Sequence, residues 1–483
     1  MRATLDPHNG AMQAIWVAWG IALSPTQALQ EFQAEPALQG ASLSVVVRRL
    51  DGSEVIALDP DRRLIPASNQ KLLTAAYALS RLGPSFQTKT EVRVQGTQAE
   101  MKTEFDPSWS LDRLAALRAE LPRIKSWTLV EPVAPYIPFG WELDDLPHRY
   151  AAPVSALMIE QNSFTLWGRS GKVWLPPEFG YRLRRMPSSA PVQVDVDYLG
   201  RVLTVSGRVP QAQTALETLA IPDPHGTLRR ALGGQWKVNS RPSTWPVWRR
   251  FAGPNLGSLL QECLSRSQNL ISEGLLLRSA LAEGELPRKD PARAAGERLE
   301  KFLVSQVGVR PQDARVVDGS GLSRHNLVTA RGIADLLSWI PRQSWGSEFR
   351  KALARPGEGT LRNRLIGVQF EGKTGTSNYT NSLSGYLTLS SGETWIVSIL
   401  TNHALAPASE VRAALDRLVV RLAQNPIGTT LASSAKYGSR PQIIPDPSPR
   451  TSDWNRVSRS LRYGDFARPR PDRRTQSADA AAH

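Results

Sequence analysis

Ser68 and Lys71 form an S-x-x-K element at the start of a predicted helix. This spacing puts the hydroxyl and the amine about one helical turn apart on the same face. A desolvated lysine has a lowered pKa and can take the serine proton, while the helix dipole favours negative charge on the serine oxygen. The element therefore predicts a nucleophilic serine with a lysine base. Ser433 and Lys436 share the spacing without a helical pattern or a core, so we assign them no chemistry.

Two further polar elements follow along the chain. Ser267 and Asn269 form an S-x-N element inside a predicted helical region, where the hydroxyl can relay a proton to a leaving amine and the amide can hold a substrate backbone. A K-T-G-T element opens a predicted strand, and it offers a cation and hydroxyls to a terminal carboxylate and backbone N–H groups to an extended peptide. Its residues are Lys373, Thr374, Gly375 and Thr376. Three such elements in this order favour acyl transfer to a serine.

The elements that must position these residues follow from hydrophobic periodicity. Ser42–Arg49 and Glu54–Leu58 are β-rich runs joined by a D-G turn, which predicts an antiparallel hairpin. Apolar positions at helical spacing follow Ser68 and stop at Gly83, so Ser68 begins a buried helix. Further helices are predicted at 256–277, 333–340 and 411–422, and strands from Lys373 onwards and at 383–389 and 394–401.

The sequence pattern changes between residues 90 and 245. It predicts short strands and a helix at Leu111–Leu121, and prolines and tryptophans are frequent. We predict a mixed α/β domain at 90–245, inserted into a catalytic domain formed by 29–89 and 246–425. Beyond it the apolar periodicity vanishes, which predicts a disordered basic tail at 426–483. The tail is either a weak tether to an anionic cell wall or a merely solvated extension.

An apolar run at Ala11–Leu23, followed by small residues up to Ala28, resembles a secretory signal and predicts a signal peptide at 1–28. The positive flank of the run is weak, so a buried N-terminal helix is the alternative. The run is too short to span a bilayer comfortably. A signal peptide predicts an exported protein, either periplasmic or associated with the cell wall.

Composition narrows the class of protein. Hydrophobic residues make up 41% and charged residues 21% of the chain, which is typical of a globular protein. The net charge of +15 suits an anionic partner, but no nucleic-acid-binding motif or long basic block occurs, so we predict no nucleic-acid binding. Cys263 is the single cysteine and is expected in a buried helix, so internal disulfides and thiolate-rich metal sites are excluded. The six histidines lack metal-ligand spacing, and we expect no metal and no cofactor.

The sequence resembles the class C low-molecular-mass penicillin-binding proteins, which are D-alanyl-D-alanine carboxypeptidases and endopeptidases. The resemblance covers most of residues 40–420, and the long connection between Ser68 and Ser267 is typical of that family. It rests on the three elements above and on segments that occur in family order. These segments are PASNQKLLTAA from Pro66, APVSAL from Ala152, DGSGLSRHNL from Asp318 and GTLR from Gly359.

The resemblance implies an α/β, serine penicillin-recognising transpeptidase-like fold: an antiparallel sheet with helices on both faces, an all-helical part and a large inserted domain. It implies a D-Ala-D-Ala carboxypeptidase, or an endopeptidase, that acts on peptidoglycan stem peptides and is inhibited by β-lactams. Ser68 would form the acyl-enzyme with Lys71 as base, and Ser267 and Asn269 would relay protons and position substrate. Substrate binding would fall to Lys373, Thr374, Gly375, Thr376 and Arg324, with the backbone N–H groups of Ser68 and Thr376 as oxyanion hole.

Two positions depart from the family pattern. Gln268 stands where the family usually has Asp, and Glu131-Pro132-Val133 stands where an acidic D-D-S run is common. Two alternatives stay open: a catalytically weak or inactive wall-binding protein on the same fold, and a β-lactamase or esterase on the same scaffold. The β-lactamase differs in how fast water removes the acyl group from Ser68. The sequence leaves the oligomeric state open.

Overall fold

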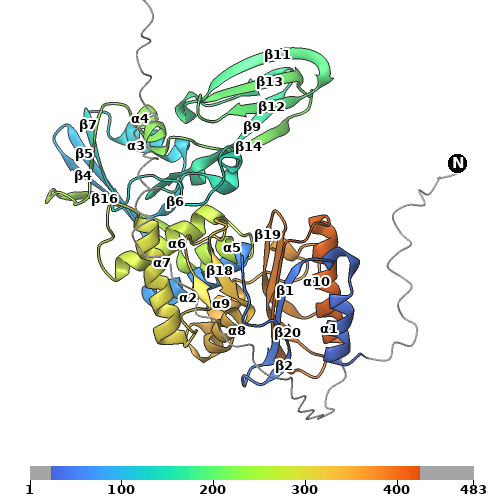
Figure 1. The fold of residues 1–483 in the computed structure, drawn as a ribbon. Coiled ribbons are helices and arrows are strands. Elements are labelled where there is room, and N and C mark those ends of the chain that lie inside the picture. The colour runs from blue at the N-terminus through green and yellow to red at the C-terminus, as the bar shows by residue number, and fades with distance from the viewer. Residues whose placement is uncertain (1–22, 425–483) are drawn as a thin grey trace, which may run out of the picture. The chain divides into compact units, whose positions relative to one another are not determined.

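The computed structural model describes residues 23–424 (Figure 1). Most of the predicted signal peptide and the whole predicted tail lie outside these residues. The described chain begins with α1 (Pro25–Gln33), which Ser24 caps by accepting the backbone N–H of Gln27. Residues 25–28, which we predicted as the end of the signal peptide, belong to this helix, and Ala28 is fully buried. No helix within residues 23–424 is long and apolar enough to cross a membrane.

A five-stranded antiparallel sheet organises the catalytic part, in the order β19-β20-β21-β1-β2. The predicted hairpin at its far edge is confirmed, and so is the predicted pair β20 and β21. The strand that carries the K-T-G-T element, β19, is the other edge. The strands are β1 (Ser42–Arg49), β2 (Glu54–Leu58), β19 (Phe370–Ser377), β20 (Thr380–Thr388) and β21 (Thr394–Asn402).

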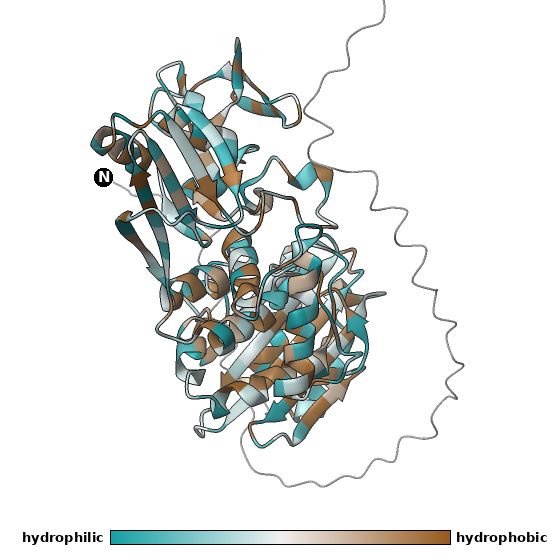
Figure 2. Ribbon diagram, turned by 90° about the vertical axis from the view of Figure 1, so that its left-hand side faces the viewer, coloured by the Kyte–Doolittle hydropathy of each residue, from teal (hydrophilic) through white to brown (hydrophobic). Residues whose placement is uncertain are grey.

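Helices cover both faces of this sheet, which confirms the predicted fold class (Figure 1). On one face α1 and α10 (Ala408–Ala423) pack together, and on the other α8 (Ala330–Trp339) packs on β1 and β21. Successive side chains of β1 alternate between the two cores, because Val45 and Val47 face α1 and α10 while Val46 faces the other side. Figure 2 shows hydrophobic residues concentrated along these strands.

A cluster of helices stands beside the sheet. It consists of α2 (Gln70–Leu82), α5 (Leu256–Leu264), α6 (Asn269–Ala282) and α7 (Pro291–Phe302). Nearly every residue of α6 is buried, because α2, α5 and α7 all pack against it. Cys263 is buried in α5, as predicted.

The chain between residues 256 and 277 forms two helices, so the single predicted helix is wrong. The first helix ends at Leu264 and the second begins at Asn269. Ser267 lies in the connection with a φ of 62°, a left-handed conformation that costs a non-glycine residue about 1–2 kcal/mol. Apolar spacing continues across the break, and this continuity hides the break in the sequence.

The inserted part contains a mixed five-stranded sheet in the order β15-β7-β5-β4-β16. Its first strand, β4 (Gln87–Gln95), pairs with its last, β16 (Val247–Asn255), so the chain leaves and re-enters the catalytic part side by side. β4 begins before the predicted boundary at 90, and β16 lies wholly beyond the predicted boundary at 245. Two helices pack with this sheet, α3 (Leu111–Glu120) and α4 (Pro224–Leu232).

The remaining strands are short or belong to smaller sheets. Those of the inserted part are β5 (Gln98–Thr103), β6 (Asp106–Trp109), β7 (Ser126–Val130), β8 (Leu157–Ile159), β9 (Ser163–Arg169), β10 (Lys172–Trp174), β11 (Arg182–Pro191), β12 (Gln193–Asp197), β13 (Val202–Arg208), β14 (Thr214–Ala220) and β15 (Gln235–Asn239). The catalytic part adds β3 (Arg63–Leu64), β17 (Ala314–Arg315), β18 (Leu327–Thr329) and the helix α9 (Gly346–Lys351).

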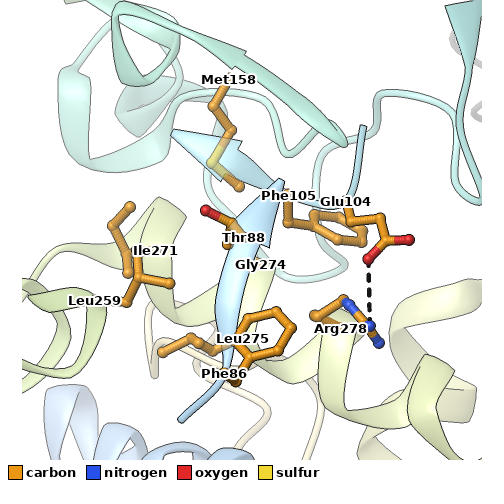
Figure 3. Close-up of a pocket in the computed structure, with 10 residues that line it drawn as sticks. All are labelled: Phe86, Thr88, Glu104, Phe105, Met158, Leu259, Ile271, Gly274, Leu275 and Arg278. Atoms are coloured by element: carbon orange, nitrogen blue, oxygen red, sulfur yellow. Dashed lines mark ion pairs between the residues drawn. The ribbon is translucent and has the colours of Figure 1, made fainter. Parts of the chain in front are cut away.

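A cavity of about 10 Å³ lies where the inserted part packs against α6 (Figure 3). This volume holds about one water, so the cavity is a packing defect rather than a ligand site. Gly274 permits the close approach, because a Cβ there would lie 2.8 Å from Cε of Met158. Figure 3 shows Glu104 and Arg278 facing each other across this contact, as an ion pair of 3.3 Å.

Two glycines let neighbouring segments touch the chain that carries Ser68. Gly321 has a φ of 82°, and a Cβ there would lie 1.8 Å from the carbonyl oxygen of Ala67. A Cβ on Gly375 of β19 would lie 2.9 Å from the carbonyl oxygen of Pro66 and 3.0 Å from the backbone nitrogen of Ser68. These contacts fix the segment from two sides.

We predict that Gly321→Ala lowers the free energy of unfolding by at least about 2 kcal/mol, because left-handed strain is added to a clash with backbone that cannot move aside. Gly308→Ala is the matched control. Gly308 has a φ of 87° with nothing within 4 Å of its Cβ position, so this variant has the backbone strain without a steric clash. Thermal and denaturant unfolding measure both variants. Equal losses of stability would contradict the close contact at Ala67.

Candidate active site

Ser68 lies in a single 3₁₀ turn, Ala67–Asn69, that leads into α2. The turn is tied to β20, because the Ser382 hydroxyl donates to the carbonyl oxygen of Pro66 at 2.7 Å and Asn69 Nδ2 donates to Ser384 Oγ at 2.7 Å. Ala67 is buried with a φ of 47°, a strained conformation that these contacts hold. Ser68 itself is half-buried and lines a cleft.

Lys71 is fully buried, and its ammonium nitrogen has three oxygen neighbours. Nζ lies 3.0 Å from Ser68 Oγ, 2.6 Å from Asn269 Oδ1 and 2.6 Å from the carbonyl oxygen of Ser320. An amide oxygen and a carbonyl oxygen only accept hydrogen bonds, so two N–H groups of Lys71 point at Asn269 and Ser320. In the neutral amine the lone pair then faces Ser68 Oγ, which is the geometry of a base for that hydroxyl.

The environment of Lys71 favours this neutral form. Burial lowers the pKa of Lys71 to about 8, against the opposing influence of Cys263, Asp318 and Glu273. Among residues 23–424 no carboxylate oxygen contacts this nitrogen directly, and Asp318 and Glu273 act on it from a greater distance. A substantial fraction of Lys71 is therefore neutral slightly above neutral pH.

The S-x-N element contributes Ser267 from the connection before α6 and Asn269 as the first residue of α6. Asn269 accepts from Lys71 through Oδ1 and donates through Nδ2 to the carbonyl oxygen of Tyr150 at 2.8 Å. Ser267 Oγ accepts from Lys373 Nζ at 2.9 Å. The predicted residues thus form two hydrogen-bonded groups, Ser68 with Lys71 and Asn269, and Ser267 with Lys373. Ser68 and Ser267 line the same cleft.

Lys373, which the sequence predicts as a strand-edge cation for a terminal carboxylate, is turned inward. Its side chain is fully buried, and Nζ donates to Ser267 Oγ and, at 2.8 Å, to the carbonyl oxygen of Thr374. Burial, and then repulsion by Lys71, hold the pKa of Lys373 well below its ordinary value. The backbone of β19 is at the edge of the sheet, but the ammonium points inward and positions Ser267.

Two buried carboxyl groups that the sequence did not single out hold the loop behind Lys71. Glu273 of α6 accepts the backbone N–H groups of Gly319 at 3.0 Å and Ser320 at 2.8 Å. Asp318 accepts from Trp141 Nε1 at 2.9 Å and from three groups of its own loop at 2.7 Å each, the backbone N–H groups of Gly321 and Ser323 and Asn326 Nδ2. Burial raises the pKa of Glu273 to about 8. The loop thereby presents the Ser320 carbonyl oxygen to Lys71 at a fixed position.

The cleft has a volume of about 680 Å³, and Ser68, Ser267, Thr374 and Thr376 form one of its walls. Gly375 lies between the two threonines and against the backbone nitrogen of Ser68. The nucleophile Ser68, the Ser267 hydroxyl that contacts the buried Lys373 ammonium, and the edge strand β19 therefore all border the same cleft. A peptide that binds along β19 would present its carbonyl groups to Ser68.

Arg324, a predicted substrate-binding residue, and Glu131, which stands where the family commonly has D-D-S, do not line this cleft. Arg324 forms a two-point ion pair with Glu142, at 3.0 Å and 3.2 Å. Glu131 is buried in the inserted part, 2.9 Å from His225 Nε2. The acidic partner at Arg324 is therefore Glu142, which the sequence did not identify.

An antiparallel sheet between two helical layers, with a serine and two buried lysines at its edge, is the arrangement of the penicillin-recognising serine enzymes. The sequence profile of the D-Ala-D-Ala carboxypeptidase 3 (S13) family matches residues 25–422, and the chain belongs to this family. It is therefore a serine peptidase.

Known relatives agree with this assignment. The D-alanyl-D-alanine carboxypeptidase of Actinomadura sp. (strain R39) is 29% identical over 468 residues, covering 81% of this chain and 82% of the relative. The crystal structure of penicillin-binding protein 4 from Haemophilus influenzae has a TM-score of 0.66 at 22% identity and covers 83% of this chain and 98% of its own. The same protein complexed with a β-lactam has a TM-score of 0.64 at 20% identity, with the same coverage.

We predict that the second-order rate of Ser68 acylation by penicillin rises about tenfold per pH unit below the Lys71 pKa of about 8 and levels off above it. The sign follows from the base: only neutral Lys71 accepts the serine proton, and this form grows as the pH rises. Stopped-flow acylation between pH 6 and 10 measures the profile, with unfolding followed at each pH as control. A rate that stays flat across this range would contradict Lys71 as the base.

Proposed function

We propose that this protein is a serine-type D-Ala-D-Ala carboxypeptidase that acts on peptidoglycan stem peptides through an acyl-enzyme on Ser68. One observation carries the proposal. Two N–H groups of buried Lys71 donate to Asn269 and Ser320, so that in the neutral amine the lone pair of the nitrogen faces Ser68 Oγ. The family assignment supports the substrate class.

In the proposed acylation step, Ser68 Oγ attacks the carbonyl carbon of the penultimate D-alanine while Lys71 takes the serine proton. The tetrahedral oxyanion accepts hydrogen bonds from the backbone N–H groups of Ser68 and Thr376. The C–N bond then breaks, and the proton returns through the Ser267 hydroxyl to the departing amine. Water, deprotonated by Lys71, attacks the ester and releases the shortened peptide.

The peptide backbone is expected to pair with β19. Edge strands offer N–H and C=O groups to an added strand, and Thr374 and Thr376 present their hydroxyls to the cleft beside it. Asn269, held between Lys71 and Tyr150, completes the positioning of the substrate. Arg324 keeps a proposed role in binding the side chain of the stem peptide, with Glu142 as its neighbour.

Inhibition by β-lactams belongs to the same proposal. A β-lactam offers Ser68 a strained amide whose opening gives a slowly hydrolysed ester. The Haemophilus influenzae relative, which has been solved in complex with a β-lactam, supports this expectation. We further propose that the protein is exported to the periplasm or the cell wall, where peptidoglycan is found, and that the basic tail favours the anionic wall.

The alternatives differ in the fate of the acyl-enzyme. An endopeptidase would cleave cross-linked peptides through the same acyl-enzyme, and a β-lactamase would release the penicilloyl group rapidly. An inactive wall-binding protein would not acylate at all. The intact contacts of Lys71 with Ser68 and Asn269 favour an active enzyme.

We predict that labelled penicillin attaches covalently to Ser68 and that Ser68→Ala abolishes both labelling and release of D-alanine from D-Ala-D-Ala peptides. Ser433→Ala is the matched control, because Ser433 also precedes a lysine by three residues and should leave both activities unchanged. Peptide mapping of the adduct by mass spectrometry locates the label. A stable adduct on any other residue would overturn the mechanism.

A further inference from the structure

One part of the lining of the cleft that holds Ser68 is basic. It is formed by the segment 359–364 and by the first half of α10, and it contributes Arg362, Arg364, Arg412 and Asp416. Arg364 is neutralised, because its guanidinium binds both carboxylate oxygens of Asp416 at 2.9 Å and 2.8 Å. Neither Arg362 nor Arg412 has an ion-pair partner or a side-chain hydrogen bond within residues 23–424. The cleft therefore carries two uncompensated positive charges on this part of its lining.

The part of the lining around Ser68 and β19 offers an arriving carboxylate little positive charge of its own. The Lys373 ammonium is buried and its nitrogen already donates to Ser267 and to the Thr374 carbonyl oxygen. Lys71 is likewise buried and engaged. Thr374 and Thr376 can donate hydrogen bonds, but they are neutral. A substrate that ends in a carboxylate needs a cation that can reach it, and guanidinium groups suit carboxylates geometrically.

We propose that Arg412, assisted by Arg362, binds the C-terminal carboxylate of the substrate on the leaving-group side of the scissile bond. The inference rests on the proposed carboxypeptidase function and assigns the recognition of the free acid to α10 and the segment 359–364. Arg412 is half-buried, so part of its hydration is already removed and its interaction with a carboxylate is stronger than at a fully exposed position. Arg362 is exposed and adds a weaker, longer-range attraction.

Lys373 and Arg412 are expected to act on different steps because they contact different groups. Lys373 acts on Ser267 and thereby on proton transfer, which every substrate needs. Arg412 acts on the carboxylate, which only the free acid possesses. Loss of Lys373 should therefore slow the acid and its C-terminal amide alike, whereas loss of Arg412 should slow the acid selectively.

The experiment compares kcat/KM of the full chain for an acyl-D-Ala-D-Ala peptide and for its C-terminal amide. We expect Arg412→Gln to lower kcat/KM for the acid by about 10- to 100-fold, mainly through KM, and to leave the amide within about twofold. Arg412→Lys should recover part of the loss, and Arg362→Gln should cost about threefold. Arg342→Gln is the matched control, since Arg342 is exposed, has no ion pair in the described chain and does not line the cleft.

The outcomes separate this inference from the function on which it rests. If the wild-type protein neither cleaves the acid nor binds penicillin at Ser68, the proposed function fails. If the wild type is active and Arg412→Gln keeps the preference for the acid over the amide, the assignment of Arg412 is overturned. Equal losses for acid and amide would also overturn it, because they would indicate a structural role for Arg412 or a different carboxylate.

Discussion

The burial of two lysines in one site is the constraint on which the rest of the structure depends. Lys71 and Lys373 are both fully buried, and the charge of Lys71 adds to burial in lowering the pKa of Lys373. An isolated buried ammonium costs several kcal/mol, so every N–H must find an oxygen and part of the charge must be given up as a lowered pKa. Lys71 donates to the Ser320 carbonyl oxygen and the Asn269 amide oxygen, and Lys373 donates to the Thr374 carbonyl oxygen and the Ser267 hydroxyl.

This constraint explains features that look unrelated in the sequence. The loop at 318–321 must place a carbonyl oxygen against Lys71, so its N–H groups are held by Glu273 and Asp318 from two sides. The break between α5 and α6 places Ser267 against Lys373 and Asn269 against Lys71, at the cost of a left-handed residue. The nearby carboxyl groups oppose the lowering of the Lys71 pKa from a distance and do not touch the nitrogen, so Lys71 keeps a lowered pKa instead of forming an ion pair.

The sequence predicted the elements whose signals are local. The hairpin of β1 and β2, the helix after Ser68 and the strands that follow Lys373 each carry a periodicity and a turn within about fifteen residues. The order of the three motifs was enough to predict which polar groups would meet. Glu273 was missed because it is a lone acidic residue in a mostly apolar helix, and Arg412 because a basic residue on an amphipathic helix looks like a solvated one. The inward direction of Lys373 depends on packing from α5 and α6, which no local pattern encodes.

Neutron diffraction from crystals of the protein would test most directly the central claim that buried Lys71 is the base. At a pD about one unit above its pKa of about 8, the account predicts two deuterons on Nζ, directed at Asn269 Oδ1 and the Ser320 carbonyl oxygen. The Ser68 hydroxyl deuteron should point at the bare side of the nitrogen. Three deuterons on Nζ, with one of them directed at Ser68 Oγ, would contradict the account.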